Sequence, residues 1–175
     1  MRLFVAVPVP DEIRKRVAQL GTTIAYDGVN VVRPENMHLT LKFIGEVEDS
    51  KANEIKKSLD MVKLKPFEVI VRGVGVFPNE DYVRVVWTGV ESNGELEKLA
   101  TVVGQSVRYG GDNEKFSAHL TIARVKKKID FQEFLGTNKQ TEFGKFTVKK
   151  FELIQSMLGP SGPKYITLAS FEGKK

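Results

Sequence analysis

The sequence predicts an α+β fold with two lobes, in which a strand-helix-strand-helix-strand unit occurs twice around an approximate two-fold axis. Three observations lead to this prediction. Apolar residues alternate between strand and helix periodicities along the 175 residues. The same order of elements repeats after about 81 residues. The two histidines of the chain, at positions 38 and 119, begin the matching tetrapeptides HLTL and HLTI.

The first half contains five expected elements. A strand at 2–7 is followed by a helix from about residue 11. The first histidine lies in a strand at 37–44, which precedes a helix from about residue 50 and a strand at 67–76. Each strand is a short run rich in aliphatic residues, and each helix has apolar residues three or four positions apart.

The second half repeats this order. Ser92 and Glu95 have the spacing of a capping box, which predicts that a helix opens at Ser92. The expected elements are a strand at 82–90, this helix, a strand at 118–123, a short helix at 130–135, a strand at 146–154 and a last strand at 165–171. We therefore expect one domain over 1–175, with approximate halves 1–80 and 81–175 and antiparallel sheets flanking a central cleft.

Composition narrows the classes of function. The formal net charge is +5 and the pI is about 9.3, which favours an anionic partner such as RNA, although a lysine-rich solvated surface explains the charge equally well. The absence of cysteine excludes disulfides and thiolate zinc sites and fits a cytoplasmic protein. No apolar stretch reaches the ~20 residues of a membrane span, so we expect no membrane association.

The histidine strands predict a reactive site. Side chains alternate between the two faces of a strand, so His38 and Thr40 share one face, as do His119 and Thr121. Their Cα atoms should lie about 6.6 Å apart, close enough for the imidazole and the hydroxyl to touch one small anion. A half-buried histidine satisfied by a local hydrogen bond is the common alternative for a single motif. The matched pair argues against that alternative here.

Two segments carry a resemblance to a known family. RPENMHLTLKFIGE at 33–46 and FSAHLTIAR at 116–124 resemble the two signatures of the two-histidine (2H) phosphoesterases. Within that superfamily the chain is most similar to the RNA 2',3'-cyclic phosphodiesterases, also called 2'-5' RNA ligases, and the similarity covers nearly the whole chain. Pro34 and Ala118 depart from the family pattern without changing a reacting group.

The resemblance implies an enzyme that hydrolyses RNA 2',3'-cyclic phosphate ends to 2'-phosphates without a metal or cofactor. The four residues His38, Thr40, His119 and Thr121 would be catalytic. The histidines would serve as acid and base and the threonines would donate hydrogen bonds to the phosphate oxygens. We expect His119 to be the base and His38 the acid, and the approximate symmetry leaves the opposite assignment open. Running backwards, the same site would join RNA ends by a 2'-5' bond.

Further residues are candidates for substrate binding. In an ideal strand Lys42 shares the face of His38, whereas Arg124 has the opposite parity to His119 and would meet RNA or an ion pair only if the strand twists. Arg33 could contact a phosphate. The aromatic candidates for stacking on a base are Phe77, Trp87 and Tyr165, although packing in the core is the more common use of such residues.

Two alternatives remain open at this point. The same chemistry could act on a small cyclic nucleotide or a 2'-5' oligonucleotide, and a non-catalytic RNA-binding module could keep the cleft. The expected partner is RNA with a cyclic phosphate end, such as a tRNA fragment, bound by a monomer.

Overall fold

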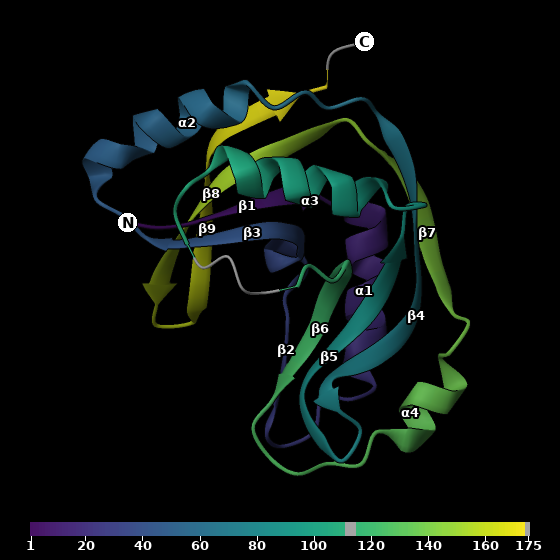
Figure 1. Ribbon diagram of the computed structural model, residues 1–175. Coiled ribbons are helices and arrows are strands. Elements are labelled where there is room, and N and C mark those ends of the chain that lie inside the picture. Colours follow the sequence, from purple (N-terminus) through teal and green to yellow (C-terminus); the bar gives the residue numbers. More distant parts are fainter. Residues whose placement is uncertain (111–114, 174–175) are drawn as a thin grey trace.

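The computed structural model describes residues 1–110 and 115–173 and contains two antiparallel sheets (Figure 1). Sheet A has the order β3 (His38–Glu46), β1 (Arg2–Pro8), β8 (Lys150–Gly159) and β9 (Gly162–Glu172). Sheet B has the order β2 (Val29–Val31), β6 (His119–Val125), β5 (Tyr82–Glu91), β4 (Phe67–Asn79) and β7 (Glu142–Val148). The helices are α1 (Asp11–Thr22), α2 (Ala52–Asp60), α3 (Glu95–Ser106) and α4 (Gln132–Thr137), with short 3-10 turns η1 (Pro34–Asn36) and η2 (Asp49–Lys51). The predicted α+β class with antiparallel sheets is confirmed.

The helices cover one face of each sheet and leave the other face open. Helix α3 packs against β3, and α1 packs against β6 and β7. The contact face of α1 buries Ile13 and Val17, while that of α3 buries Leu96, Leu99 and Val103. Each buried aliphatic side chain of this kind contributes roughly 1.5–3 kcal/mol. We call the uncovered side of each sheet its open face.

The two halves of the sequence exchange strands. Strand β4 belongs to the first half but lies between β5 and β7 in sheet B, whereas β8 and β9 of the second half join β1 in sheet A. The order β3-β1-β8-β9 therefore corresponds to β6-β5-β4-β7, with the two histidine strands in equivalent positions. The predicted duplication is present, and neither half supplies all the strands of a sheet.

The strand expected at 146–154 is wrong, because it is two strands. β7 ends at Val148 and lies in sheet B, and β8 begins at Lys150 and lies in sheet A. The chain thus changes sheets at Lys149, within a continuous β-like pattern. Strand β2 was not expected either, since three residues are too few to show a periodicity.

The start of α3 also differs from expectation. The helix begins at Glu95, and its N-cap is Gly94 in the left-handed conformation (φ 82°), not Ser92. The Ser92 hydroxyl still accepts a hydrogen bond from the backbone N–H of Leu96 at 3.0 Å. Ser92 therefore satisfies a free N–H of the first turn from outside the helix.

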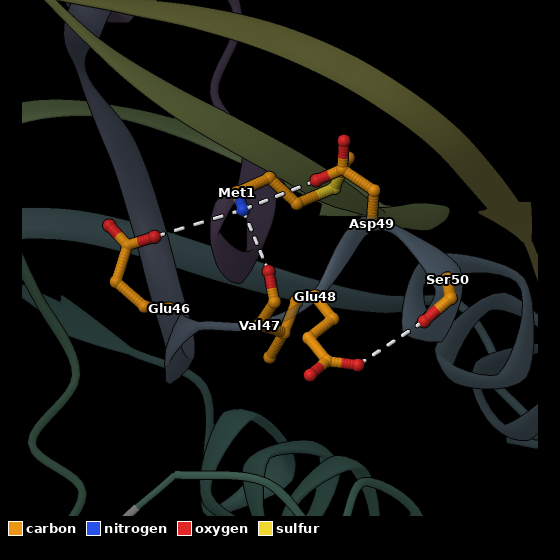
Figure 2. Close-up of polar contacts among 6 residues, drawn as sticks. All are labelled: Met1, Glu46, Val47, Glu48, Asp49 and Ser50. Carbon is orange, nitrogen blue, oxygen red and sulfur yellow. Dashed lines mark hydrogen bonds and ion pairs between the residues drawn. The ribbon is translucent and has the colours of Figure 1, made fainter.

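The start of β1 is tied to the segment after β3 (Figure 2). The Met1 ammonium donates to the Val47 carbonyl at 2.7 Å and to Asp49 Oδ1 at 3.5 Å, and it lies 3.7 Å from Glu46 Oε2. These contacts extend the pairing of β1 with β3 beyond its last rung.

In the parts of the chain that the structure describes, no helix is long and apolar enough to cross a bilayer.

Candidate active site

His38 and Thr40 lie on the open face of sheet A. Thr40 pairs with Ala6 of β1, and paired residues of neighbouring strands share a face. Ala6 belongs to a small apolar cluster with Phe4 and Ile154, separate from the main core. Leu39 and Leu41 point to the opposite, buried face, so the predicted alternation around the first histidine holds.

Two aromatic rings hold the His38 imidazole by edge contacts. The centroid of the His38 ring lies 6.3 Å from that of Phe4 and 5.7 Å from that of Tyr165. Phe4 and Tyr165 also contact one another, at 5.0 Å. Tyr165 thus packs beside the histidine at the margin of the site, half-buried, and its proposed stacking on a base stays a prediction.

Burial lowers the pKa of His38 below its ordinary value of 6.5, because desolvation penalises the imidazolium form. The backbone of Asn36 and the carboxylate of Glu152 oppose this shift, and the Arg14 guanidinium adds to it. Free of substrate, His38 is therefore more readily neutral than an exposed histidine. Sequence reasoning missed both charged neighbours. The carboxylate in the apolar run FELI at 151–154 could have indicated Glu152.

Glu152 is a buried carboxylate on β8, opposite Ala6. Its oxygens lie 3.4 Å from Lys150 Nζ, 3.4 Å from Thr167 Oγ1 and 3.5 Å from Ser170 Oγ. These contacts are long for hydrogen bonds to a buried charge, and the negative charge of Glu152 favours the imidazolium form of His38.

We expect the His38 imidazole to titrate below pH 6.5 in an NMR titration of its Cε1–H signal, because burial disfavours the charged form. Glu152→Gln should lower this pKa further, since it removes a negative charge that favours the imidazolium. Glu133→Gln, an exposed change on α4, is the matched control and should leave the titration unchanged. A pKa at or above 6.5 in the unmodified protein would contradict the burial argument.

His119 and Thr121 occupy the equivalent place on sheet B. Thr121 pairs with Trp87, and the His119 ring lies 5.1 Å from the Phe77 ring and 6.4 Å from the Trp87 ring, centroid to centroid. The Trp87 indole lies against Gly75, where an added Cβ would collide with the ring. Phe77 and Trp87 are half-buried and line the histidine, and their stacking on a base also stays a prediction.

The backbone two residues before each histidine lies beside its ring. His119 Nδ1 is 2.7 Å from the Ser117 carbonyl, which fixes the tautomer with the proton on Nδ1 and leaves Nε2 for chemistry. His38 Nδ1 is buried next to the backbone of Asn36 but makes no hydrogen bond of ordinary geometry. The two histidines therefore have the same backbone neighbour, but only the His119 ring is fixed by a hydrogen bond to it.

The strands that carry the motifs meet. β3 and β6 contact one another although they belong to different sheets, and each begins with its histidine. Figure 1 shows the beginnings of both strands near the centre of the molecule. Two titratable imidazoles and two hydroxyls are thus available on adjoining open faces. Within residues 1–110 and 115–173, no three His, Asp or Glu side chains group as a metal site would require.

A β-bulge places Arg124 on the site face, contrary to its predicted parity. Thr121 pairs with Trp87 but Ala123 pairs with Val86, so β6 contains one extra residue. Arg124 then pairs with Val85, which pairs with Phe77, the residue in contact with His119. Arg124 is exposed on this face.

A bulge in β3 has the opposite effect on Lys42. Thr40 pairs with Ala6 but Lys42 pairs with the buried Val5, so Lys42 leaves the face of His38 and Thr40 and the ideal-strand expectation is wrong. Phe43 takes its place, 61% exposed and 6.1 Å from the Phe4 ring. Arg33 is exposed just before η1, and its role stays a prediction.

Comparison with known proteins gives consistent matches. Residues 7–87 match the family model described as LigT like Phosphoesterase. The RNA 2',3'-cyclic phosphodiesterase of Archaeoglobus fulgidus is 42% identical over 98% of this chain and 100% of its own, and that of Methanocaldococcus jannaschii is 34% identical over 94% and 96%.

Solved structures agree with these matches. The protein TT0787 of Thermus thermophilus covers 100% of both chains with a TM-score of 0.83 and 31% identity. Escherichia coli LigT complexed with 3'-AMP has a TM-score of 0.83 over 99% of this chain and 98% of its own. Its identity is 23%, so this second likeness concerns the fold.

Proposed function

Because the chain belongs to the LigT-like phosphoesterase family, we propose that it is an RNA 2',3'-cyclic phosphodiesterase that opens the cyclic phosphate at RNA ends to a 2'-phosphate. The observation that carries this proposal is the pair of His–Thr motifs at the starts of two contacting strands, β3 and β6. Binding alone does not require two titratable groups. Hydrolysis of a phosphodiester requires both a base and an acid.

The reaction needs two proton transfers at the phosphorus. A water oxygen forms a bond to phosphorus as the P–O3' bond breaks, one imidazole takes the proton from water, and the other gives a proton to O3'. The lowered pKa of His38 favours its neutral form, which suits the base. The Ser117 carbonyl accepts the Nδ1–H that His119 carries in both protonation states. We therefore propose His38 as base and His119 as acid, the reverse of the first expectation.

The remaining groups would bind the phosphate. Thr40 and Thr121 would donate their hydroxyls to the two non-bridging oxygens, where negative charge builds in the transition state. Arg124 is available on the same face as His119 and can pair with a phosphate oxygen. Lys42 is no longer a good candidate, because it lies opposite Val5.

The same site would catalyse ligation when a 5'-hydroxyl replaces water. The base would then deprotonate that hydroxyl, and the product would be a 2'-5' phosphodiester. Water at ~55 M competes with this reaction unless the second RNA end is held in position, which can contribute several kcal/mol. We propose a monomeric cytoplasmic enzyme acting on RNA fragments, among which tRNA fragments are candidates. The lack of cysteine supports this setting.

An oligoribonucleotide ending in a 2',3'-cyclic phosphate tests the proposal. With excess EDTA present, we expect a product with a 2'-phosphate and a free 3'-hydroxyl, because the acid acts on O3' and no metal is required. Nuclease digestion followed by chromatography against 2'- and 3'-nucleotide standards identifies the end. A 3'-phosphate product, or activity lost in EDTA and restored by one divalent ion, would contradict the proposal.

A further inference from the structure

A cluster of cations around a tyrosine lies at the far end of sheet B, outside the histidine site. Tyr82 is 52% exposed, and the Arg84 guanidinium carbon lies 4.4 Å from the centroid of its ring. Arg84 also donates to the Val125 carbonyl at 3.4 Å and to the Tyr82 hydroxyl. Tyr82 and Arg84 line one small hollow with Val83 and the three lysines at 126–128. The guanidinium is thus held in place at the surface.

The cluster keeps most of its positive charge. Lys127 pairs with Asp27. Among the described residues, no carboxylate lies within 4.0 Å of the charged nitrogens of Arg84, Lys126 or Lys128. Such a group of cations attracts an anion and releases counterions when it binds one.

The cluster continues the open face of sheet B. A bulge in β5 at Arg84, where Phe77 pairs with Val85 but Pro78 pairs with Val83, turns Val83 into the core. Tyr82 and Arg84 flank this buried valine and Lys126 follows the buried valine that ends β6, so all three point to the face that carries Arg124. At ~3.3 Å per residue they lie roughly 16–23 Å from His119 along the strands. In Figure 1 this end of β5 and β6 is at the bottom of the molecule. The turn between β4 and β5 adds two acidic residues at 80–81, which limits the cationic surface on that side.

We propose that Tyr82, Arg84 and Lys126 bind the single-stranded RNA upstream of the cyclic phosphate, and that the enzyme therefore prefers oligonucleotides to mononucleotide cyclic phosphates. This inference rests on the proposed function. An aromatic ring beside cations is the combination that binds unpaired RNA, because the ring stacks on a base while the cations contact phosphates. A mononucleotide seated between the histidines is too short to reach the cluster, whereas an oligonucleotide can follow the open face to it.

The test compares two substrates on the intact protein. We expect Arg84→Gln/Lys126→Gln to lower kcat/KM about tenfold on a five-nucleotide RNA ending in a 2',3'-cyclic phosphate and to leave hydrolysis of adenosine 2',3'-cyclic phosphate unchanged. The slope of log(kcat/KM) against log salt should fall by about 0.7 for each phosphate that the variant no longer neutralises. Tyr82→Ala should also weaken the oligonucleotide alone, because a base can no longer stack on the ring.

Lys57→Gln/Lys63→Gln is the matched control, because it removes the same charge from exposed positions on and after α2, at the opposite end of the molecule. Equal losses on both substrates, or no loss on either, would overturn the inference while leaving the proposed function standing. If neither substrate is hydrolysed, the proposed function fails. In that case fluorescence anisotropy of a labelled five-nucleotide RNA still tests the inference. The Arg84→Gln/Lys126→Gln and Tyr82→Ala variants must then bind this RNA more weakly than the control does.

Discussion

Replacing His38 or His119 with alanine is expected to lower kcat on RNA 2',3'-cyclic phosphate by at least about 100-fold, the usual effect of losing one acid or base. In the proposed mechanism each imidazole acts once per turnover, one to take a proton from water and the other to protonate O3'. Both side chains are half-buried and packed on aromatic rings, but neither belongs to the main core. The fold should therefore survive, as circular dichroism melting will show.

Ser117→Ala is the matched control for His119, because the ring contacts the carbonyl of Ser117 and not its hydroxyl. It should keep near-normal turnover. The double variant without either histidine should be hardly slower than the single variants, because the two groups act in one step. Near-normal turnover in either single variant would rule out the paired mechanism.

Replacing Thr40 or Thr121 with alanine is expected to cost roughly 10- to 1,000-fold, mainly in kcat, if each hydroxyl donates to a phosphate oxygen as charge develops. The serine variants keep the hydroxyl and should recover most of the lost rate. Both threonines sit on open faces, where the smaller side chain leaves no buried cavity. A loss confined to KM would make the threonines ordinary binding residues.

The alternation of side chains correctly predicted the face shared by each histidine and its threonine, and it failed only beyond the bulges. Up to Thr40 and Thr121 the strands are regular, so two-residue spacing sufficed. One extra residue then reversed the expected faces of Lys42 and Arg124. A bulge depends on the neighbouring strand and on the register in which the two strands pair. The local pattern of apolar residues carries no information about either.

The repeat of about 81 residues predicted the order of elements but not their partners. Pairing of β1 with β8, and of β4 with β7, joins residues far apart in the sequence, and periodicity carries no information about such partners. The break at Lys149 follows from the same exchange, because a single β-like run supplies one strand to each sheet. The sequence did not indicate that Arg14 lies near His38, since an arginine in a helix is common and its spacing does not show what it packs against.

The exchange of strands has a consequence for synthesis of the protein on the ribosome. When residues 1–80 have emerged, β1 has only β3 beside it, and β4 has neither of its neighbours. The other edge of β1 stays unpaired until β8 is synthesised, about 150 residues later, and pairings so distant in sequence form slowly. The nascent first half therefore exposes strand edges that invite pairing with other chains, and it becomes protected only when the last two strands leave the exit tunnel.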